Sequence, residues 1–177
     1  ADQVYLEGKT GVPKWYGGFD NTFTYKNWDL GLSMVYQGGN YLYNTTYSSM
    51  MTNTFQNNDA RILERWTSPG QITNVPRLYM LDQTANQTST RFLEKGDFLR
   101  MRTISLGYKL EDRWVKKIGF GNIRVSGQVY NAFIITGYSG IDPEVNYNRN
   151  NSNLAVGFDN RGIPQPRTYT INLSATL

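Results

Sequence analysis

The chain has 177 residues and a net charge of +4, and 14 % of its residues are aromatic while only 18 % are charged. It contains neither cysteine nor histidine, which excludes disulfides and thiolate or imidazole metal sites and removes the commonest general base. Its Lys and Arg residues are scattered, which argues against a nucleic-acid-binding patch, and no apolar run approaches the ~18 residues of a membrane-spanning helix.

The N-terminal part predicts a β-hairpin after an irregular start. Residues 1–13 show no clear period, whereas residues 14–25 alternate between two faces. The alternation resumes over residues 28–37. Only Lys26 and Asn27 separate the two runs, so we expect a tight turn between two antiparallel strands.

A long region over residues 38–96 predicts an irregular loop rich in Tyr, Asn, Thr and Ser. Within it, residues 59–66 predict a short helix with Asp59 as its N-cap. A loop of this length is unusual in a compact soluble domain. It is expected on the outer side of a membrane barrel, where extracellular loops are long and periplasmic turns are short.

The second half predicts three further strands. These cover residues 97–110, 122–134 and 167–177, and the last one alternates strictly to the end of the sequence. A compact basic connection, residues 111–121, joins the first two. A second long loop, residues 135–166, precedes the last strand.

Two arginines interrupt the alternation of residues 97–110. Arg100 and Arg102 share the parity of the apolar Ile104 and Leu106. Either a bulge near Thr103 exchanges the two faces, or the arginines lie beyond the apolar band. They could meet lipopolysaccharide phosphates at the outer rim or form salt bridges on the lumen side, and the sequence leaves both roles open.

These elements predict an all-β fold in which short and long connections alternate. In a transmembrane barrel, one face of each strand meets lipid and aromatic residues gather at both membrane interfaces. We therefore expect these side chains to face lipid: Trp28, Leu30, Leu32, Met34 and Leu173. The predicted aromatic rims are Tyr25, Trp28 and Trp114 on the inner side, and Trp15, Tyr36 and Tyr169 on the outer side.

Two other interpretations remain open from the pattern. A soluble carbohydrate-binding β-sandwich also has alternating strands and aromatic-rich loops, but it would pack those apolar residues in a core. A hydrolase is the weaker option, because only carboxylates are available and no acidic pair occupies a convincing strand end. We assign no catalytic residue, no metal site and no cofactor.

Five segments, in order along the chain, resemble one known family. They are PKWYGGFDNTFTYKNWDL from Pro13, RWTSPGQITNVPR from Arg65, FLEKGDFLRMRTISLGYKL from Phe92, YSGIDPEVN from Tyr138 and PRTYTINL from Pro166. Together they resemble the C-terminal region of the SusC/RagA family of TonB-dependent outer-membrane transporters. The resemblance implies that residues 1–177 are the last five antiparallel strands of a barrel of about 22 strands, with two long extracellular loops. The plug and the earlier strands would lie outside this chain. Family members end more often on an aromatic residue than on Leu177.

The resemblance further implies active import of oligosaccharides or peptides, energised through TonB acting on the plug. The implied location is the outer membrane of a Gram-negative, Bacteroidetes-type bacterium. The implied partners are the rest of the barrel and plug, a SusD-like surface lipoprotein that closes the extracellular mouth, TonB, lipid, lipopolysaccharide and the substrate. Nucleic acid is not among them.

Six loop residues are weak candidates for substrate contact. Four are aromatic and could stack on sugar rings, namely Trp66, Tyr79, Tyr138 and Tyr147. The other two, Asp142 and Glu144, flank Pro143 and could act as paired carboxylates or as calcium ligands. We favour a structural role for each of the six, as packing within the loops or as turn-forming groups.

Overall fold

The computed structural model describes residues 6–52, 57–77, 79, 87–144 and 156–177. The chain divides into two compact units. We call the first the sheet unit, formed by Lys14–Gly38, Asp97–Thr136 and Gln165–Leu177. The second, formed by Ala1–Pro13, Gly39–Gly96 and Gly137–Pro164, is the loop unit.

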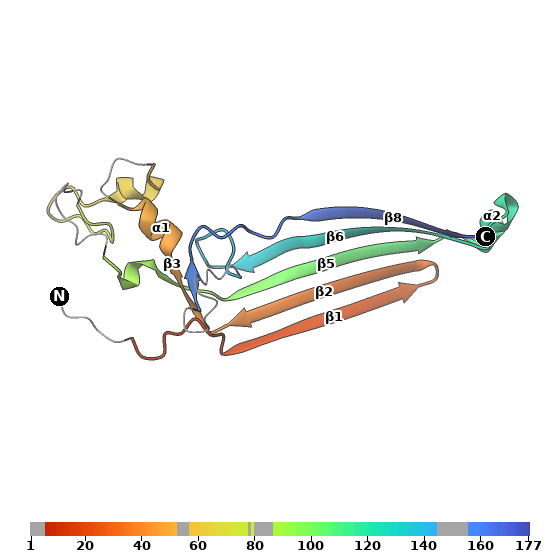
Figure 1. Cartoon of the computed structure of the whole chain (residues 1–177), viewed down its shortest axis with the longest axis horizontal. Helices are drawn as coiled ribbons and strands as arrows, with labels where there is room; N and C mark the ends of the chain where they lie inside the picture. The colour runs from red at the N-terminus through yellow and green to blue at the C-terminus, as the bar shows by residue number, and fades with distance from the viewer. Residues whose placement is uncertain (1–5, 53–56, 78, 80–86, 145–155) are drawn as a thin grey trace. The chain divides into compact units, whose positions relative to one another are not determined.

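The sheet unit is a single five-stranded antiparallel sheet (Figure 1). Its strands are β1 (Trp15–Tyr25), β2 (Trp28–Gly38), β5 (Phe98–Lys109), β6 (Asn122–Thr136) and β8 (Thr168–Thr176). They follow the spatial order β1-β2-β5-β6-β8, so strands that are consecutive in the sheet unit lie side by side. All five predicted strands are confirmed, because period-2 alternation identifies long half-apolar strands well.

Both short connections lie at one end of this sheet, together with the C-terminus (Figure 1). Lys26 and Asn27 form the first, with Lys26 at a positive φ of 52°. The second contains α2 (Asp112–Val115) and η4 (Lys116–Ile118). Two hydrogen bonds hold the connections together: Lys109 N–H donates to the Asn27 carbonyl at 2.8 Å, and Asn27 Nδ2 donates to the Lys109 carbonyl at 2.9 Å. Both long connections therefore leave from the opposite end, as the sequence predicted.

A β-bulge exchanges the faces of β5 at Arg102. Thr103 pairs with Ser33 and Met101 pairs with Met34, which leaves Arg102 without an opposite residue on β2. The neighbouring strand β6 has its own irregularity at this level, where Asn131 adopts a φ of 50°. The bulge predicted near Thr103 is thus confirmed, and it returns the apolar residues upstream of it to the apolar face.

The loop unit contains short elements that the sequence analysis missed. A small sheet has the order β4-β3-β7, with β3 (Tyr41–Asn44) antiparallel to β4 (Leu93–Lys95) and parallel to β7 (Phe158–Asp159). Two helices were missed as well, α1 (Thr45–Met50) and η3 (Thr90–Phe92), whereas η1 (Ala60–Glu64) corresponds to the short helix predicted over residues 59–66. The expectation of irregular loops was therefore wrong here, because strands of two to four residues are too short to show a period.

The helices of the loop unit are capped by side chains. Asp59 Oδ1 accepts from the Arg61 N–H, which confirms the predicted N-cap, although the helix that follows is of the 3₁₀ type. Asn44 Oδ1 caps α1 in the same way by accepting from the Tyr47 N–H at 2.8 Å. No helix in the described parts of the chain is both long and apolar enough to cross a membrane.

Candidate functional site

The pairing register sorts the sheet unit into one apolar and one polar face. Residues that pair across neighbouring strands point to the same side of the sheet. Each row of paired residues, which we call a register row, can therefore be classified as apolar or polar. The apolar rows, in order from the short-connection end, are Tyr25/Trp28/Tyr108/Val125/Leu173, Phe23/Leu30/Leu106/Gly127/Ile171, Asn21/Leu32/Ile104/Val129/Tyr169, Phe19/Met34/Met101/Phe133 and Gly17/Tyr36/Leu99/Ile135. Only Asn21 breaks this apolar face with a polar side chain.

Much of the apolar face is exposed. Ile171 is 84 % exposed, Leu173 73 %, Phe23 54 % and Leu106 48 %. Among the described residues, the sheet unit has a single layer of strands. A sandwich would need a second sheet over these residues, so the single layer favours the membrane interpretation over that alternative.

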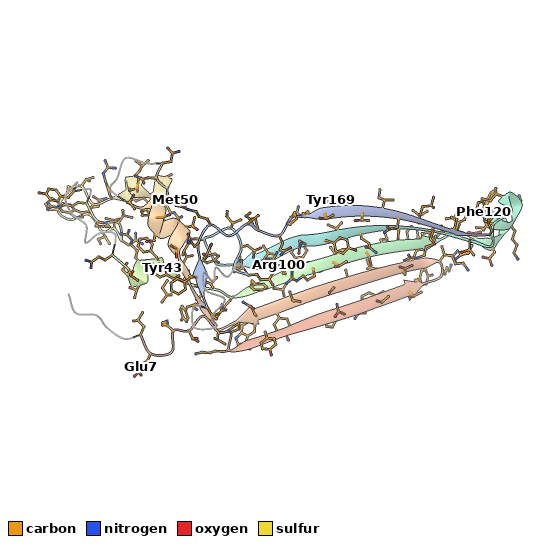
Figure 2. The ribbon with its side chains drawn as sticks, in the orientation of Figure 1. Glu7, Tyr43, Met50, Arg100, Phe120 and Tyr169 are labelled. Atoms are coloured by element: carbon orange, nitrogen blue, oxygen red, sulfur yellow. The ribbon has the colours of Figure 1, made fainter. Side chains whose placement is uncertain are left out.

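The five residues expected to face lipid all lie on this apolar face. These are Trp28, Leu30, Leu32, Met34 and Leu173. Aromatic pairs lie at both ends of the face, with ring centroids 4.6 Å apart for Trp28 and Tyr108 and 6.0 Å apart for Trp15 and Tyr36. Tyr169, which Figure 2 labels on β8, pairs with Val129 and so occupies a more central row than the outer rim predicted for it.

The opposite face carries the polar side chains of the sheet. Asp29 and Arg124 form an ion pair across β5, with Arg124 Nη2 2.6 Å from Asp29 Oδ2. The pair passes over Gly107, where a Cβ atom would clash with the end of the Arg124 side chain. Gln128 lies two register rows away on the same face. A face of this kind suits contact with water or with a polar partner.

In the loop unit, Arg61 is the centre of a network of polar contacts. Besides the nearby Asp59, the network includes Tyr47, Ser139 and, through Ser139, Glu94. The Arg61 guanidinium binds Asp59 through Nε and Nη2 at 2.9 and 2.7 Å and lies over the Tyr47 ring, 3.6 Å from the centroid. Its Nη1 also donates to Ser139 Oγ at 3.4 Å. Ser139 in turn donates twice to Glu94, from its N–H and its Oγ, both at 2.8 Å. The network links the two long loops to each other.

The charges in this network perturb two pKa values. The hydrogen bond from the Arg61 side chain lowers the pKa of Asp59 to about 2. The same hydrogen bond raises the pKa of Arg61. The pair is therefore ionised at neutral pH, and Asp59 becomes protonated only as the pH falls through about 2.

Tyr138 is a buried anchor of the loop unit. Its side chain is 5 % exposed, and its hydroxyl donates to Asp159 Oδ2 at 2.6 Å. Burial, followed by the contact with Asp159, raises the pKa of the Tyr138 phenol. The ring is therefore buried within the unit, as we favoured for the loop aromatics.

The other candidate residues occupy varied positions. Asp142 is buried, and its Oδ1 accepts from the Glu144 N–H at 2.9 Å, which is the turn-forming contact that we favoured. Trp66 is half-buried, and Tyr79 is exposed with the Arg77 guanidinium 5.3 Å from its ring centroid. Tyr147 lies outside the described residues. Contact of any of them with a substrate stays a prediction.

The network around Arg61 was not predicted from the sequence. Its long-range hydrogen bonds join residues 78 and 45 residues apart, and nothing local in the sequence indicates that Glu94 and Ser139 meet. Only the Asp59 cap gave a local signal. No group of three or more carboxylate, imidazole or thiol side chains that could hold a metal ion occurs in the portion of the chain that the structure describes.

Comparison with curated proteins shows similarity to TonB-dependent receptors. It is 31 % identical over 179 residues to TonB-dependent receptor P3 of Formosa agariphila, a match that covers 98 % of this chain and 17 % of the receptor. It is 28 % identical over 167 residues to TonB-dependent receptor SusC of Bacteroides thetaiotaomicron, covering 89 % of this chain and 14 % of SusC. The chain is homologous to a segment of the TonB-dependent receptors. It spans about a sixth of the length of these relatives. No protein-family model matches it.

Solved structures agree with this TonB-dependent receptor homology at the level of the fold. The chain superimposes on the RagAB peptide importer in its closed-closed state with a TM-score of 0.77 at 23 % identity, covering 94 % of this chain and 18 % of that one. The open-open state gives a TM-score of 0.76 at 24 % identity, covering 96 % and 18 %. The chain therefore has the fold of a fragment of a RagA/SusC-type β-barrel.

Proposed function

We propose that this chain is the C-terminal part of the barrel of an outer-membrane importer that takes up oligosaccharides or peptides. The observation that carries the proposal is the continuous apolar face of the five-stranded sheet, exposed on residues such as Leu106, Ile171 and Leu173. Exposing such a face to water is unfavourable, whereas lipid covers it at no cost. Homology to TonB-dependent receptors supports the same assignment.

The remaining strands and the plug belong to the rest of the receptor in this proposal. The open sheet has two edge strands, β1 and β8, whose outer edges pair with no other strand among the described residues. A membrane barrel tolerates no open edge, so the neighbouring strands of the receptor pair with them. The polar face, with Asp29 and Arg124, then faces the lumen and its plug.

The loop unit lies on the outer side of the membrane in this proposal. There, a SusD-like lipoprotein closes over the mouth, and TonB acting on the plug supplies the energy. The chain supplies no catalytic group. RagAB is a peptide importer, which supports the peptide class. The oligosaccharide class stays in the proposal because the family resemblance of the sequence implies it.

The experiment is uptake by cells that express the full-length receptor. Labelled oligosaccharides and peptides are supplied to cells with and without the receptor, and again after a protonophore collapses the inner-membrane proton gradient. We expect receptor-dependent uptake of one class that the protonophore abolishes, and co-purification of a surface lipoprotein in detergent. A receptor that stays soluble without detergent, or uptake that survives the protonophore, would overturn the proposal.

The alternative is a soluble carbohydrate-binding module. It would bind a glycan with no requirement for the proton gradient or for detergent. The same preparation therefore distinguishes the two.

A further inference from the structure

Positive charge gathers at the short-connection end of the sheet unit. The two connections there are joined by the hydrogen bonds between Asn27 and Lys109 described above. We call this end the cationic rim, and its cations are Lys26, Lys109, Arg113, Lys116 and Lys117. Two carboxylate side chains, Glu111 and Asp112, lie in the same connections, so the charged side chains of the rim sum to +3.

The carboxylates of the rim neutralise only part of this charge. Glu111 pairs with Arg113 at 2.6 Å, and Asp112 pairs with Lys109 at 3.6 Å. Within the described residues, Lys26, Lys116 and Lys117 lie within ion-pair distance of no carboxylate. Three ammonium groups are therefore available to an external anion.

Exposed apolar groups lie among these cations. Trp114 is 56 % exposed, and both the Arg113 guanidinium and the Lys117 Nζ lie over its ring, 5.4 and 5.3 Å from the centroid. Ile118 is 61 % exposed. The connection is not a loose tail, because Val115 is fully buried and its carbonyl accepts from the Phe120 N–H at 3.2 Å.

The rim continues the apolar face of the sheet. The first register row contains Tyr25, Trp28 and Tyr108, and Lys26 Nζ lies 5.5 Å from the centroid of the Tyr25 ring. Moving from the sheet toward the connections, the surface therefore changes from aliphatic to aromatic and then to cationic. This is the order of environments across a membrane interface, from acyl chain through carbonyl region to headgroup phosphate.

We propose that the cationic rim binds the headgroup of an anionic glycerophospholipid, with Lys116 and Lys117 on the phosphate and Trp114 in the interfacial layer. The inference rests on the proposed insertion of the sheet in a membrane and adds a lipid partner to it. Each lysine near an anionic membrane surface contributes about 1 kcal/mol of attraction, which corresponds to about a fivefold preference for an anionic over a neutral lipid. Long stems let such ammonium groups reach the headgroup while Trp114 and Ile118 stay at the acyl boundary.

The test uses the full-length receptor in nanodiscs made from phosphatidylcholine with a minor fraction of phosphatidylglycerol. One of the two lipids carries bromine on its acyl chain near the headgroup, which quenches nearby tryptophan fluorescence. The difference between the receptor and its Trp114→Phe variant isolates the signal of Trp114. We expect Trp114 to be quenched more by brominated phosphatidylglycerol than by brominated phosphatidylcholine at equal mole fraction.

The site variant is the double substitution Lys116→Gln and Lys117→Gln. We expect it to reduce the preference for the anionic lipid by roughly fivefold to thirtyfold. The matched control removes two exposed cations that lie away from the short connections, directly before β1 and β8, through Lys14→Gln and Arg167→Gln, and should leave the Trp114 signal unchanged.

Several outcomes would overturn the inference. One is an unchanged preference in the site variant, and another is an equal loss in the control. A third is that added lipopolysaccharide displaces the brominated phospholipid and restores Trp114 fluorescence, which would place the rim in the outer leaflet. If Trp114 is not quenched while the receptor still imports substrate, the inference alone fails. If the receptor does not insert in nanodiscs, the proposed function fails with it.

Discussion

The two units differ in where their apolar side chains go. Six of the nine buried hydrophobic residues in the described chain lie in the loop unit, including Phe92 at 0 % and Met51 at 3 % exposure. In the sheet unit, by contrast, residues such as Ile171 and Leu173 remain largely exposed. The part that the sequence presents as irregular loop has a core, whereas the regular sheet has its apolar groups on the outside.

The difference in apolar burial indicates which part of the chain is stabilised by its own residues. Burial of apolar surface is the main favourable contribution to folding, and the loop unit obtains it from its own residues. The sheet unit has its backbone hydrogen bonds but must obtain apolar surroundings from outside the chain. A folded loop unit is also preorganised, so binding a partner there costs less ordering entropy than binding to a flexible loop.

The largest effect is expected from removing the core of the loop unit, which tests whether this unit is stabilised by its own residues. The Phe92 ring makes edge contacts with Tyr47 and Tyr43, at centroid distances of 5.4 and 6.2 Å. We expect Phe92→Ala to reduce the stability of this unit by about 3–5 kcal/mol, because it leaves a cavity in the core. Hydrogen exchange on the full-length receptor would show faster exchange in β3, α1 and β4, with the sheet unit unchanged.

The matched control for the core variant is Ile72→Ala. Ile72 belongs to the same unit but is fully exposed, so its truncation should change stability by less than about 0.5 kcal/mol. Equal effects of the two substitutions would mean that the loop unit has no core of its own.

A charge placed on the apolar face of the sheet unit tests whether that face meets water or lipid. Ile171→Arg would be nearly neutral if water covered this 84 % exposed residue. In lipid, an arginine one row from the centre of the face should cost about 2–3 kcal/mol. Urea titration of the receptor folded in vesicles would measure the difference.

The control for this variant is the adjacent residue on the other face of β8. Asn172 lies on the polar side, so Asn172→Arg should change the free energy of unfolding by under about 1 kcal/mol. Equal costs for the two arginines would contradict the assignment of the faces.

A smaller effect is expected from the ion pair that fastens η1 in the loop unit. The lowered pKa of Asp59 means that its stabilising contribution is fully present above pH 3.8 and is lost as the pH falls through about 2. The full shift corresponds to at most ~2.5 kcal/mol. Because the Arg61 side chain is 38 % exposed, solvent screening reduces this to ~1 kcal/mol.

Two variants separate the charge of Asp59 from its capping role. Asp59→Asn keeps a capping oxygen and should cost ~1 kcal/mol at pH 6 and less at pH 2, where Asp59 is about half protonated. Asp59→Ala should cost ~1 kcal/mol more than the Asn variant at both pH values. Hydrogen exchange of residues 60–65 at the two pH values would measure the opening of η1. An Asn variant as stable as the parent at pH 6 would show that the ion pair contributes nothing.

The sheet was predictable because its signals are local. Alternation over eleven residues defines β1, and the change of parity within β5 indicated a bulge near Thr103 as one of two alternatives, which the structure places at Arg102. The cap at Asp59 is also local, since the helix that it serves begins at the next residue. Each of these features depends on neighbours in sequence.

The loop unit was largely unpredictable because its contacts join distant segments. Tyr43 pairs with Phe158 in a two-residue parallel bridge, and no pattern in either segment indicates the other. The burial of Tyr138 was equally hidden, because thirteen tyrosines in the chain give no sign of which ones meet a buried carboxylate such as Asp159. Packing of loops against each other is decided by tertiary structure.

The smallest predicted effect is also the one that reports on the environment of the polar face. The Asp29 and Arg124 side chains are 32 % and 41 % exposed, so their pair should contribute below about 1 kcal/mol in a double-mutant cycle of Asp29→Ala and Arg124→Ala. The value applies if water fills the space in front of the pair. If a plug covers the pair instead, removing one partner leaves a buried charge and costs ~3–5 kcal/mol.

Gly107→Ala gives an independent measurement, since its Cβ displaces the flexible ends of both side chains without removing a charge. A small cost for all three variants therefore indicates a hydrated lumen at this level, and a large cost for the single charge deletions alone indicates contact with the plug.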